Sequence, residues 1–201
     1  RITNTVRQGF LLGDTTEQIA RKVRGHANRG YQDGALQMSR TNAGSIAKTA
    51  VGHLAATSRK SFADANDDLL KGKQWLSTLD NRTSKDCRIR DRLKYTLANK
   101  PIGHKVPYLQ GPGKIHWCCR SVETYILKSS DELGIAIGQI SDSSRASMNG
   151  QVPADTDYHG WFSRQSFTRQ SQIVGVTRAR LIRDGGMSPD EFYNDRGEWL
   201  T

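Results

Sequence analysis

The sequence predicts an α+β fold that is rich in helix, with one long helix packed on a small β-sheet and helical extensions at both ends. Two observations lead to this prediction. Between residues 32 and 70 there is no proline, and apolar residues recur at intervals of three, four and seven, the spacing of one helix face. Residues 74–79 and 121–127 instead alternate in polarity, which favours strands.

Charge and composition limit the classes of function. The 201 residues include 30 Lys and Arg against 20 Asp and Glu, and the resulting charge of +10 favours polyanions such as DNA. The hydrophobic fraction of 35% is low, so we expect parts of the chain to rest on a partner. Three cysteines are too few for the framework of a small secreted domain and favour a reducing compartment. No apolar run reaches the roughly 20 residues of a membrane-spanning helix.

Residues 1–31 are predicted to form a helical extension. Apolar residues from Ile2 to Leu12 follow helical spacing, and Gly13 is a typical stop. Asp14 and Glu17 have the spacing of a capping box, in which each side chain satisfies the other residue's backbone donor. A second helix is therefore expected from Asp14 to about residue 26.

Residues 32–128 are predicted to form the α+β core. The apolar face of its long helix consists of Leu36, Ala43, Ala47, Ala50 and Leu54. Because this face is mainly alanine, it buries little area and needs a neighbour for stability. Residues 93–113 hold three prolines and three glycines, which predicts a long loop with at most one short hairpin. The residues expected in the core are Trp75, Leu79, Val122, Tyr125 and Leu54.

The remainder is predicted to be a linker followed by helices. Residues 129–157 are rich in Ser and Gly, apart from an apolar run at 133–137, and indicate a linker. Residues 158–201 form a C-terminal helical segment, with helices expected at 158–172 and 173–183. Ser188, Pro189 and Glu191 give the signature of one more helix start.

Cysteine and histidine gather between residues 87 and 119. Cys87, His116 and Cys119 are the residue types that bind zinc, although a structural site needs four such ligands. Cys118 is a doubtful fourth ligand, because adjacent side chains on an extended backbone point to opposite faces. The sequence leaves three alternatives open, namely a zinc site, a buried cluster without metal, and a Cys87–Cys119 disulfide.

An enzyme that uses a thiol nucleophile is the chemical alternative. Cys119, His116 and Asp80 would then act as nucleophile, base and orienting group. No oxyanion hole or substrate cleft is evident around them, and no glycine-rich nucleotide-binding motif occurs. We therefore expect no enzymatic activity and no resident cofactor, with zinc as the alternative.

An ordered set of short motifs resembles one known family. The set comprises Arg40-Thr41, Trp75-Leu-Ser-Thr-Leu-Asp80-Asn-Arg82-Thr83 with Cys87, Gly111-Pro112, His116-Trp-Cys-Cys119-Arg120, and a closing segment from Tyr158 to Gly185. In this order the motifs resemble the phage head morphogenesis proteins, also called Mu F-like minor head proteins. Family members often have cysteine where this chain has Ser84 and Ser121, and an acidic residue where it has Asn42, which weakens the zinc interpretation.

The resemblance implies a minor capsid protein of a tailed bacteriophage. Such proteins are present in multiple copies in the virion, in the head interior near the portal, and in the host cytoplasm during assembly. The implied partners are the portal, other head proteins and double-stranded DNA bound without sequence preference, and the implied roles are head assembly and DNA packaging or ejection. The alternative is a Mu F-like module of an effector or toxin enzyme.

The motif residues are expected to form a structural clamp at the two ends of the long loop. Its members are Asp80, Arg82, Thr83 and Cys87 on one side and His116, Cys119 and Arg120 on the other. Asp and Arg can satisfy buried backbone groups there, and a buried partner left unpaired costs about 1–3 kcal/mol.

Overall fold

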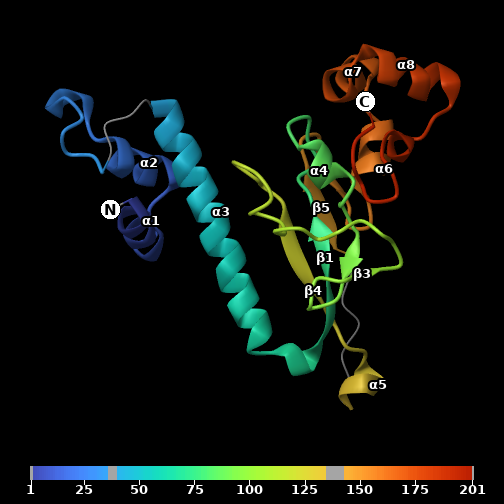
Figure 1. The fold of residues 1–201 in the computed structure, drawn as a ribbon, viewed down its shortest axis with the longest axis horizontal. Helices are drawn as coiled ribbons and strands as arrows, with labels where there is room; N and C mark the ends of the chain where they lie inside the picture. The colour runs from blue at the N-terminus through green and yellow to red at the C-terminus, as the bar shows by residue number, and fades with distance from the viewer. Residues whose placement is uncertain (1, 36–39, 135–142, 201) are drawn as a thin grey trace. The chain divides into compact units, whose positions relative to one another are not determined.

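A computed structural model describes residues 2–35, 40–134 and 143–200. The chain divides into two compact units, which we call unit 1 (Arg1–Phe62 with Gly113–Cys119) and unit 2 (Ala63–Pro112 with Arg120–Thr201). The predicted α+β class is confirmed, because both a long helix and a small antiparallel sheet form (Figure 1).

Unit 1 is built from helices. They are α1 (Ile2–Leu11), α2 (Thr16–Arg24), the 3-10 turn η1 (Ala27–Arg29) and the long helix α3 (Arg40–Asp64). The core between them is small and aliphatic and consists of Val6, Ile19, Val23, Ala43 and Ala47. The helices α1 and α2 approach closely, because a Cβ atom at Gly9 would lie 2.7 Å from the Ile19 side chain.

The cap of α2 differs from the prediction by one residue. Thr15, not Asp14, is the N-cap, and its hydroxyl accepts from the backbone N–H of Gln18 while the Gln18 side chain accepts from that of Thr15. The predicted partner Glu17 therefore lies one position too early. Asp14 instead forms an ion pair with Lys22, with 2.5 Å between Oδ2 and Nζ.

Unit 2 contains a four-stranded antiparallel sheet in the order β3-β2-β1-β4. The strands are β1 (Leu70–Leu76), β2 (Lys94–Tyr95), β3 (Pro101–Ile102) and β4 (Val122–Leu127). The strand β4 and the short β2–β3 hairpin in the long loop agree with the sequence, but β1 begins four residues earlier than predicted. The strand can include Gly72 and Lys73 because the glycine lies against the Tyr95 carbonyl, where a Cβ would be 2.8 Å away, and Lys73 pairs with Glu123.

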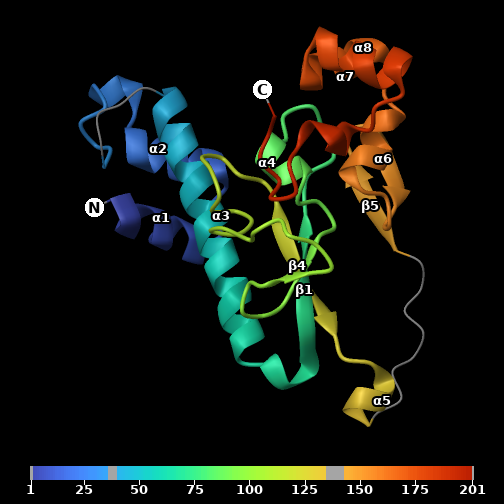
Figure 2. The same cartoon turned by 45° about the vertical axis from the view of Figure 1, so that its right-hand side comes forward.

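The segment predicted as a linker forms secondary structure. It holds α5 (Ser130–Leu133) and a hairpin of β5 (Ser144–Ser147) and β6 (Gly150–Pro153). The hairpin lies next to α6 in Figures 1 and 2, and the Met148 N–H donates to the Leu79 carbonyl at 3.0 Å. Most of the predicted apolar run at 133–137 lies outside the described residues.

The C-terminal helices are shorter than predicted. They are α6 (Tyr158–Ser163), α7 (Phe167–Val174), α8 (Val176–Gly185) and η3 (Pro189–Phe192), while α4 (Lys85–Arg88) and η2 (Asp67–Leu69) occur earlier in the chain. The predicted helix 158–172 breaks because the Ser166 hydroxyl accepts from the Arg169 N–H and starts a new helix. The predicted capping box at Ser188 and Glu191 is confirmed.

The core of unit 2 is aromatic. One cluster consists of Leu79, Tyr158, Trp161, Phe162, Ile173, Val174 and Ala179. The prediction that Trp75 and Leu79 are core residues is confirmed, since both are fully buried. Val122, Tyr125 and Leu54 are only half-buried. The first two lie on β4, an edge strand of the sheet, which leaves them partly exposed.

Candidate functional site

The centre of the predicted clamp is a bidentate ion pair between Asp80 and Arg120. The guanidinium donates to both carboxylate oxygens, with 2.5 Å from Nη1 to Oδ2 and 2.9 Å from Nη2 to Oδ1. Asp80 Oδ1 also accepts from the backbone N–H of Arg82 at 3.0 Å and lies 3.1 Å from the Thr83 hydroxyl. Paired parallel bonds of this kind fix geometry as well as adding energy, so the pair joins the turn after β1 to the residues before β4.

The environment of Asp80 favours its charged form. Burial disfavours the charge, but hydrogen bonds from Arg120, the Arg82 N–H and Thr83, together with the Arg120 charge, outweigh it. The pKa of this carboxyl therefore lies below its ordinary value. Asp80 is ionised at neutral pH and acts as an acceptor for its neighbours.

Thr83 and Ser84 shape the turn that leads into α4. The Thr83 hydroxyl lies 2.6 Å from the Thr78 carbonyl, and the Thr83 carbonyl accepts from Arg88 Nε at 2.7 Å. Ser84 is the N-cap of α4, and its hydroxyl accepts from the Cys87 N–H at 3.3 Å. A serine at this position, where relatives often have cysteine, thus has a capping function here.

Cys87 is buried at the end of this turn, with 1% of its surface exposed. Its carbonyl accepts from the Ser77 hydroxyl at 2.7 Å. Cys87 is therefore fixed by its backbone, in unit 2.

The second half of the predicted clamp lies on a turn of unit 1. Cys119 Sγ accepts from the Gly113 N–H at 3.3 Å, which closes the turn Gly113–Cys119. Cys118 has a φ of 55°, and its N–H donates to Thr49 Oγ1 on α3 at 2.9 Å. The neighbouring cysteines thus serve different contacts, one to α3 and one within the turn.

His116 belongs to the same turn. Its Nδ1 lies 2.9 Å from the Trp117 carbonyl, and the tautomer that donates this bond leaves Nε2 as the acceptor nitrogen. Trp117 itself is 70% exposed.

The predicted site residues are thus divided between the units. Unit 2 brings Asp80, Thr83 and Arg120 together, and Arg82 contributes its backbone N–H. His116 and Cys119 share the turn of unit 1, and Cys87 lies in unit 2. Among the described residues, Cys87, Cys118 and Cys119 form no disulfide, which contradicts the Cys87–Cys119 alternative. Thiols and an imidazole nitrogen are ligands that zinc accepts, so zinc at Cys87, His116 and Cys119 stays a prediction.

Sequence reasoning missed a buried ion pair in unit 2. Arg145 on β5 binds Asp91 through two bonds, 2.6 Å from Nη2 to Oδ1 and 2.9 Å from Nη1 to Oδ2. Arg145 also donates to the carbonyls of Thr156 and Ser77, and the Ser77 N–H donates to Asp91. Burial raises the pKa of the Asp91 carboxyl, and the charge of Arg145 opposes that rise. The one available signal was an aspartate between two arginines, just before the predicted loop 93–113.

A second missed network lies on the sheet. Glu123 on β4 pairs with Lys73 on β1, with 3.6 Å between Oε2 and Nζ, and both side chains are buried. The Tyr108 hydroxyl donates to Glu123, as does that of Tyr125 at 2.7 Å. The Lys73 ammonium lies 4.1 Å from the centre of the Tyr108 ring. Burial and the Glu123 charge raise the pKa of Tyr108, so this phenol stays neutral and donates.

These features define a class of protein, an α+β module in which the motif residues of unit 2 bind one another and the backbone. Among the helices described, none combines the length and hydropathy of a bilayer span. The family described as Phage Mu protein F like protein matches residues 1–124, and the chain belongs to that family, as the motifs predicted. It is a phage head morphogenesis protein, to be found in the virion with other head proteins. No curated protein and no solved structure matches the chain.

Proposed function

We propose that this protein is a structural minor capsid component without enzymatic activity. It acts in the head interior beside the portal, in multiple copies, and is in the host cytoplasm while heads assemble. It binds the portal and other head proteins, contacts packaged double-stranded DNA without sequence preference, and aids assembly and DNA packaging or ejection.

The observation that carries this proposal is the Asp80–Arg120 pair inside the family match. Both carboxylate oxygens of Asp80 accept from Arg120, and the other contacts of this carboxylate go to the Arg82 N–H and the Thr83 hydroxyl. His116 Nδ1 is engaged by the Trp117 carbonyl. Groups used in this way hold turns in place, which supports an architectural role over the use of Asp80 to orient a catalytic histidine.

The charge of the chain supports the DNA contact. A protein with a formal charge of +10 gains affinity for DNA through release of the counterions condensed on the phosphates. This term is independent of base sequence, so the expected binding is flat across DNA sequences and falls steeply with salt.

The test is the composition of purified heads. Heads assembled with the wild-type chain should hold it in a fixed copy number beside the portal, measured by quantitative mass spectrometry and by cross-linking. Asp80→Ala should reduce incorporation, while Asp155→Ala, a change at an exposed carboxylate, should not. A chain absent from heads, whose Cys119→Ala form loses a measurable catalytic activity, would instead support the effector-enzyme alternative.

A further inference from the structure

The two units differ sharply in formal charge. Unit 1 has eleven Lys and Arg against three acidic residues, a charge of +8, whereas unit 2 has nineteen against seventeen, a charge of +2. Unit 1 thus supplies most of the net charge from about a third of the chain. We infer that unit 1 makes the contact with double-stranded DNA and that unit 2 does not, an inference that rests on the proposed function.

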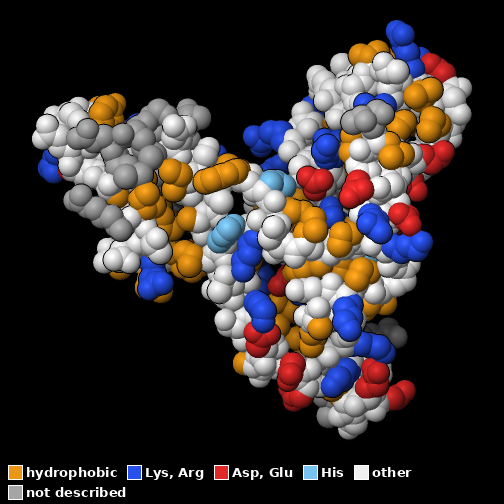
Figure 3. Space-filling model, viewed as in Figure 1, with side chains coloured by type: hydrophobic (Ala, Val, Ile, Leu, Met, Phe, Trp, Pro, Cys, Tyr) orange, Lys and Arg blue, Asp and Glu red, His pale blue; other side chains and the backbone are white. Residues whose placement is uncertain are grey.

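The cations of unit 2 are largely used inside that unit. Those with a hydrogen bond or ion pair to a neighbouring group are Lys71, Lys73, Arg88, Arg90, Arg92, Lys105, Arg120, Lys128, Arg145, Arg169, Arg178 and Arg183. Several of these donate to main-chain carbonyls, for example Arg88 to Ile173 and Arg92 to Ala154. A guanidinium fixed in this way is less available to a phosphate. Figure 3 shows acidic and basic side chains intermixed on the face of unit 2 that is in view, which also weakens the field of that face.

The cations of unit 1 are used differently. Two of its three acidic side chains are engaged, Asp14 by Lys22 and Asp33 by His26 and Arg29. Its exposed cations include Arg7, Arg21, Lys48 and Arg59. Within the described part of the chain, none of these four side chains makes a hydrogen bond or an ion pair. They face water and can exchange it for phosphate oxygens.

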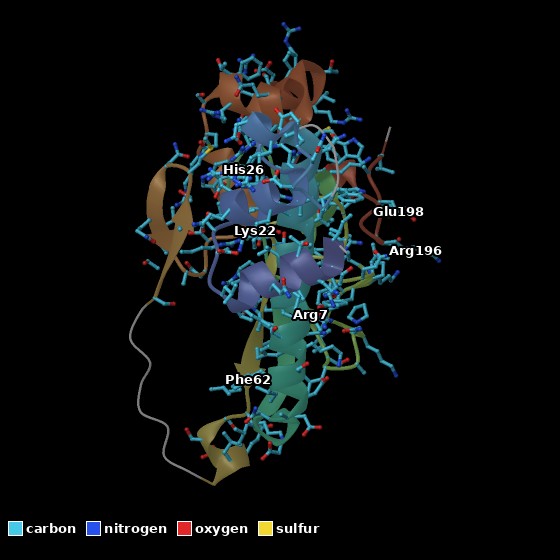
Figure 4. All side chains as sticks on the ribbon, turned by 90° about the vertical axis from the view of Figure 1, so that its left-hand side faces the viewer. Arg7, Lys22, His26, Phe62, Arg196 and Glu198 are labelled. Atoms are coloured by element: carbon cyan, nitrogen blue, oxygen red, sulfur yellow. The ribbon has the colours of Figure 1, made fainter. Side chains whose placement is uncertain are left out.

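The four cations are spread over all three α-helices of unit 1. Arg7 is on α1, Arg21 on α2, and Lys48 and Arg59 on α3. Eleven residues make about three helical turns, so Lys48 and Arg59 lie on one face of α3, about 16 Å apart. Figure 4 labels Arg7 on α1 and Lys22 on α2, on the face of unit 1 turned to the viewer.

The spread of these four cations over three helices favours DNA as the binding partner over a protein with a compact acidic patch. A helix of 25 residues is about 37 Å long, and cations spaced along it match a linear, evenly charged polymer better than a small cluster of carboxylates. Duplex DNA carries one charge per ~1.7 Å of its axis, so it presents phosphates at short intervals along any helix that it follows.

The test compares two matched sets of charge removals in the full chain. The unit 1 variant combines Arg7→Gln, Arg21→Gln, Lys48→Gln and Arg59→Gln. The unit 2 variant combines Lys94→Gln, Lys100→Gln, Arg164→Gln and Arg180→Gln, four exposed positions with the same change of charge. Affinity for a random-sequence duplex is measured by fluorescence anisotropy from 50 to 300 mM salt.

We expect the unit 1 variant to lose roughly ten- to a thousandfold in affinity at 100 mM salt and to reduce the slope of log K against log salt by about 3 to 4. The unit 2 variant should stay within about threefold of wild type, since only the long-range field changes. The double variants Arg7→Gln/Arg21→Gln and Lys48→Gln/Arg59→Gln should each show part of the loss, and they keep the test valid if the fourfold variant does not fold.

Different failures have different meanings. If wild type does not bind the duplex at all, the proposed DNA contact itself is wrong. If wild type binds and the unit 2 variant loses as much affinity as the unit 1 variant, the inference is wrong while the proposed function stands. The inference is also wrong if the unit 1 variant keeps its DNA affinity and loses binding to purified head proteins.

Discussion

The two units of this molecule place polar groups in opposite ways. Within the described residues, all ten buried polar or charged side chains belong to unit 2, among them Lys73, Asp91 and Glu123. The core of unit 1 contains only small and aliphatic residues, such as Val6 and Ala47. Unit 2 therefore has an interior that depends on specific pairing, and unit 1 has one that depends on close helix packing.

This difference between the two units shows that the role of a basic residue depends on whether it is buried or exposed. An arginine that donates to buried carbonyls, as Arg145 does, replaces the water that those groups lose on folding. An exposed arginine such as Arg7 leaves its charge to the solvent and to any polyanion nearby. The net charge of +10 therefore includes two kinds of cation. Buried cations bind groups inside the protein, and exposed cations are open to a polyanion.

The largest loss of stability is expected when one member of the buried Asp91–Arg145 pair is removed. Asp91→Ala should lower the free energy of unfolding by about 3–5 kcal/mol, because the Arg145 charge stays buried without its partner. Urea unfolding followed by tryptophan fluorescence reports mainly on unit 2, which holds Trp75, Trp161 and Trp199. Asp155→Ala is the matched control and should change the free energy by less than about 0.5 kcal/mol. Equal effects of the two changes would contradict the role given to the buried pair.

A smaller loss of stability is expected when the Asp80–Arg120 pair is broken, because the Arg120 side chain is 40% exposed. Asp80→Ala should cost about 1–3 kcal/mol. Arg82→Ala keeps the backbone N–H that Asp80 uses and should therefore be nearly neutral.

The Asp80–Arg120 pair also predicts that the stability of the fold depends on pH. Since the pKa of Asp80 is lowered in the folded state, its stabilisation is complete above the ordinary value of 3.8 and is lost as the pH falls below it. Asp80→Asn should remove this part of the acid dependence, measured as the unfolding midpoint between pH 5 and pH 2.5. An unchanged pH profile in Asp80→Asn would show that the pair does not contribute.

Alanine substitutions at two glycines of unit 1 should change its stability in opposite directions. Gly113→Ala should destabilise the turn by about 1–2 kcal/mol, since Gly113 has a φ of 77° and the new Cβ would lie 3.0 Å from the Gly52 carbonyl oxygen. Gly44→Ala should stabilise α3 by about 0.5–1 kcal/mol, because no atom lies within 4 Å of the new Cβ. Amide hydrogen exchange along α3 measures both effects locally. Stabilisation by Gly113→Ala would contradict the close approach.

The smallest effect is expected from metal removal. Ser84 and Ser121, which replace cysteines common in relatives, serve hydrogen bonds instead, to the Cys87 N–H and to the Ser77 hydroxyl. Cys87, His116 and Cys119 supply three N/S ligands, whereas structural zinc takes four. We expect a chelator to leave the melting midpoint unchanged. A drop that added zinc restores, and that Cys87→Ser abolishes, would assign zinc to Cys87, His116 and Cys119.

Local patterns in the sequence were sufficient for much of the fold. Apolar spacing predicted α1 and α3, and alternation predicted β4, because these signals repeat within a few residues. The same reasoning misplaced the α2 cap by one residue and the start of β1 by four. Both errors arise where a side chain has a tertiary partner, Lys22 for Asp14 and Glu123 for Lys73.

The candidate site was predicted in part. Motif order identified Asp80 and Arg120, which do form a pair. The Asp91–Arg145 pair could not be found in this way, because its members are 54 residues apart and Arg145 lies in a Ser- and Gly-rich segment that was predicted to be a linker. One sequence contains no signal for a contact at that distance.

That separation also affects how the protein is made. Synthesis proceeds at about 5–20 residues per second, so Asp91 is translated roughly three to ten seconds before Arg145. During that interval the carboxylate has no guanidinium to balance it and cannot enter a dry interior without a large penalty. We therefore expect the β1–β2 region to stay open during synthesis and the interior of unit 2 to close after β5 has been made.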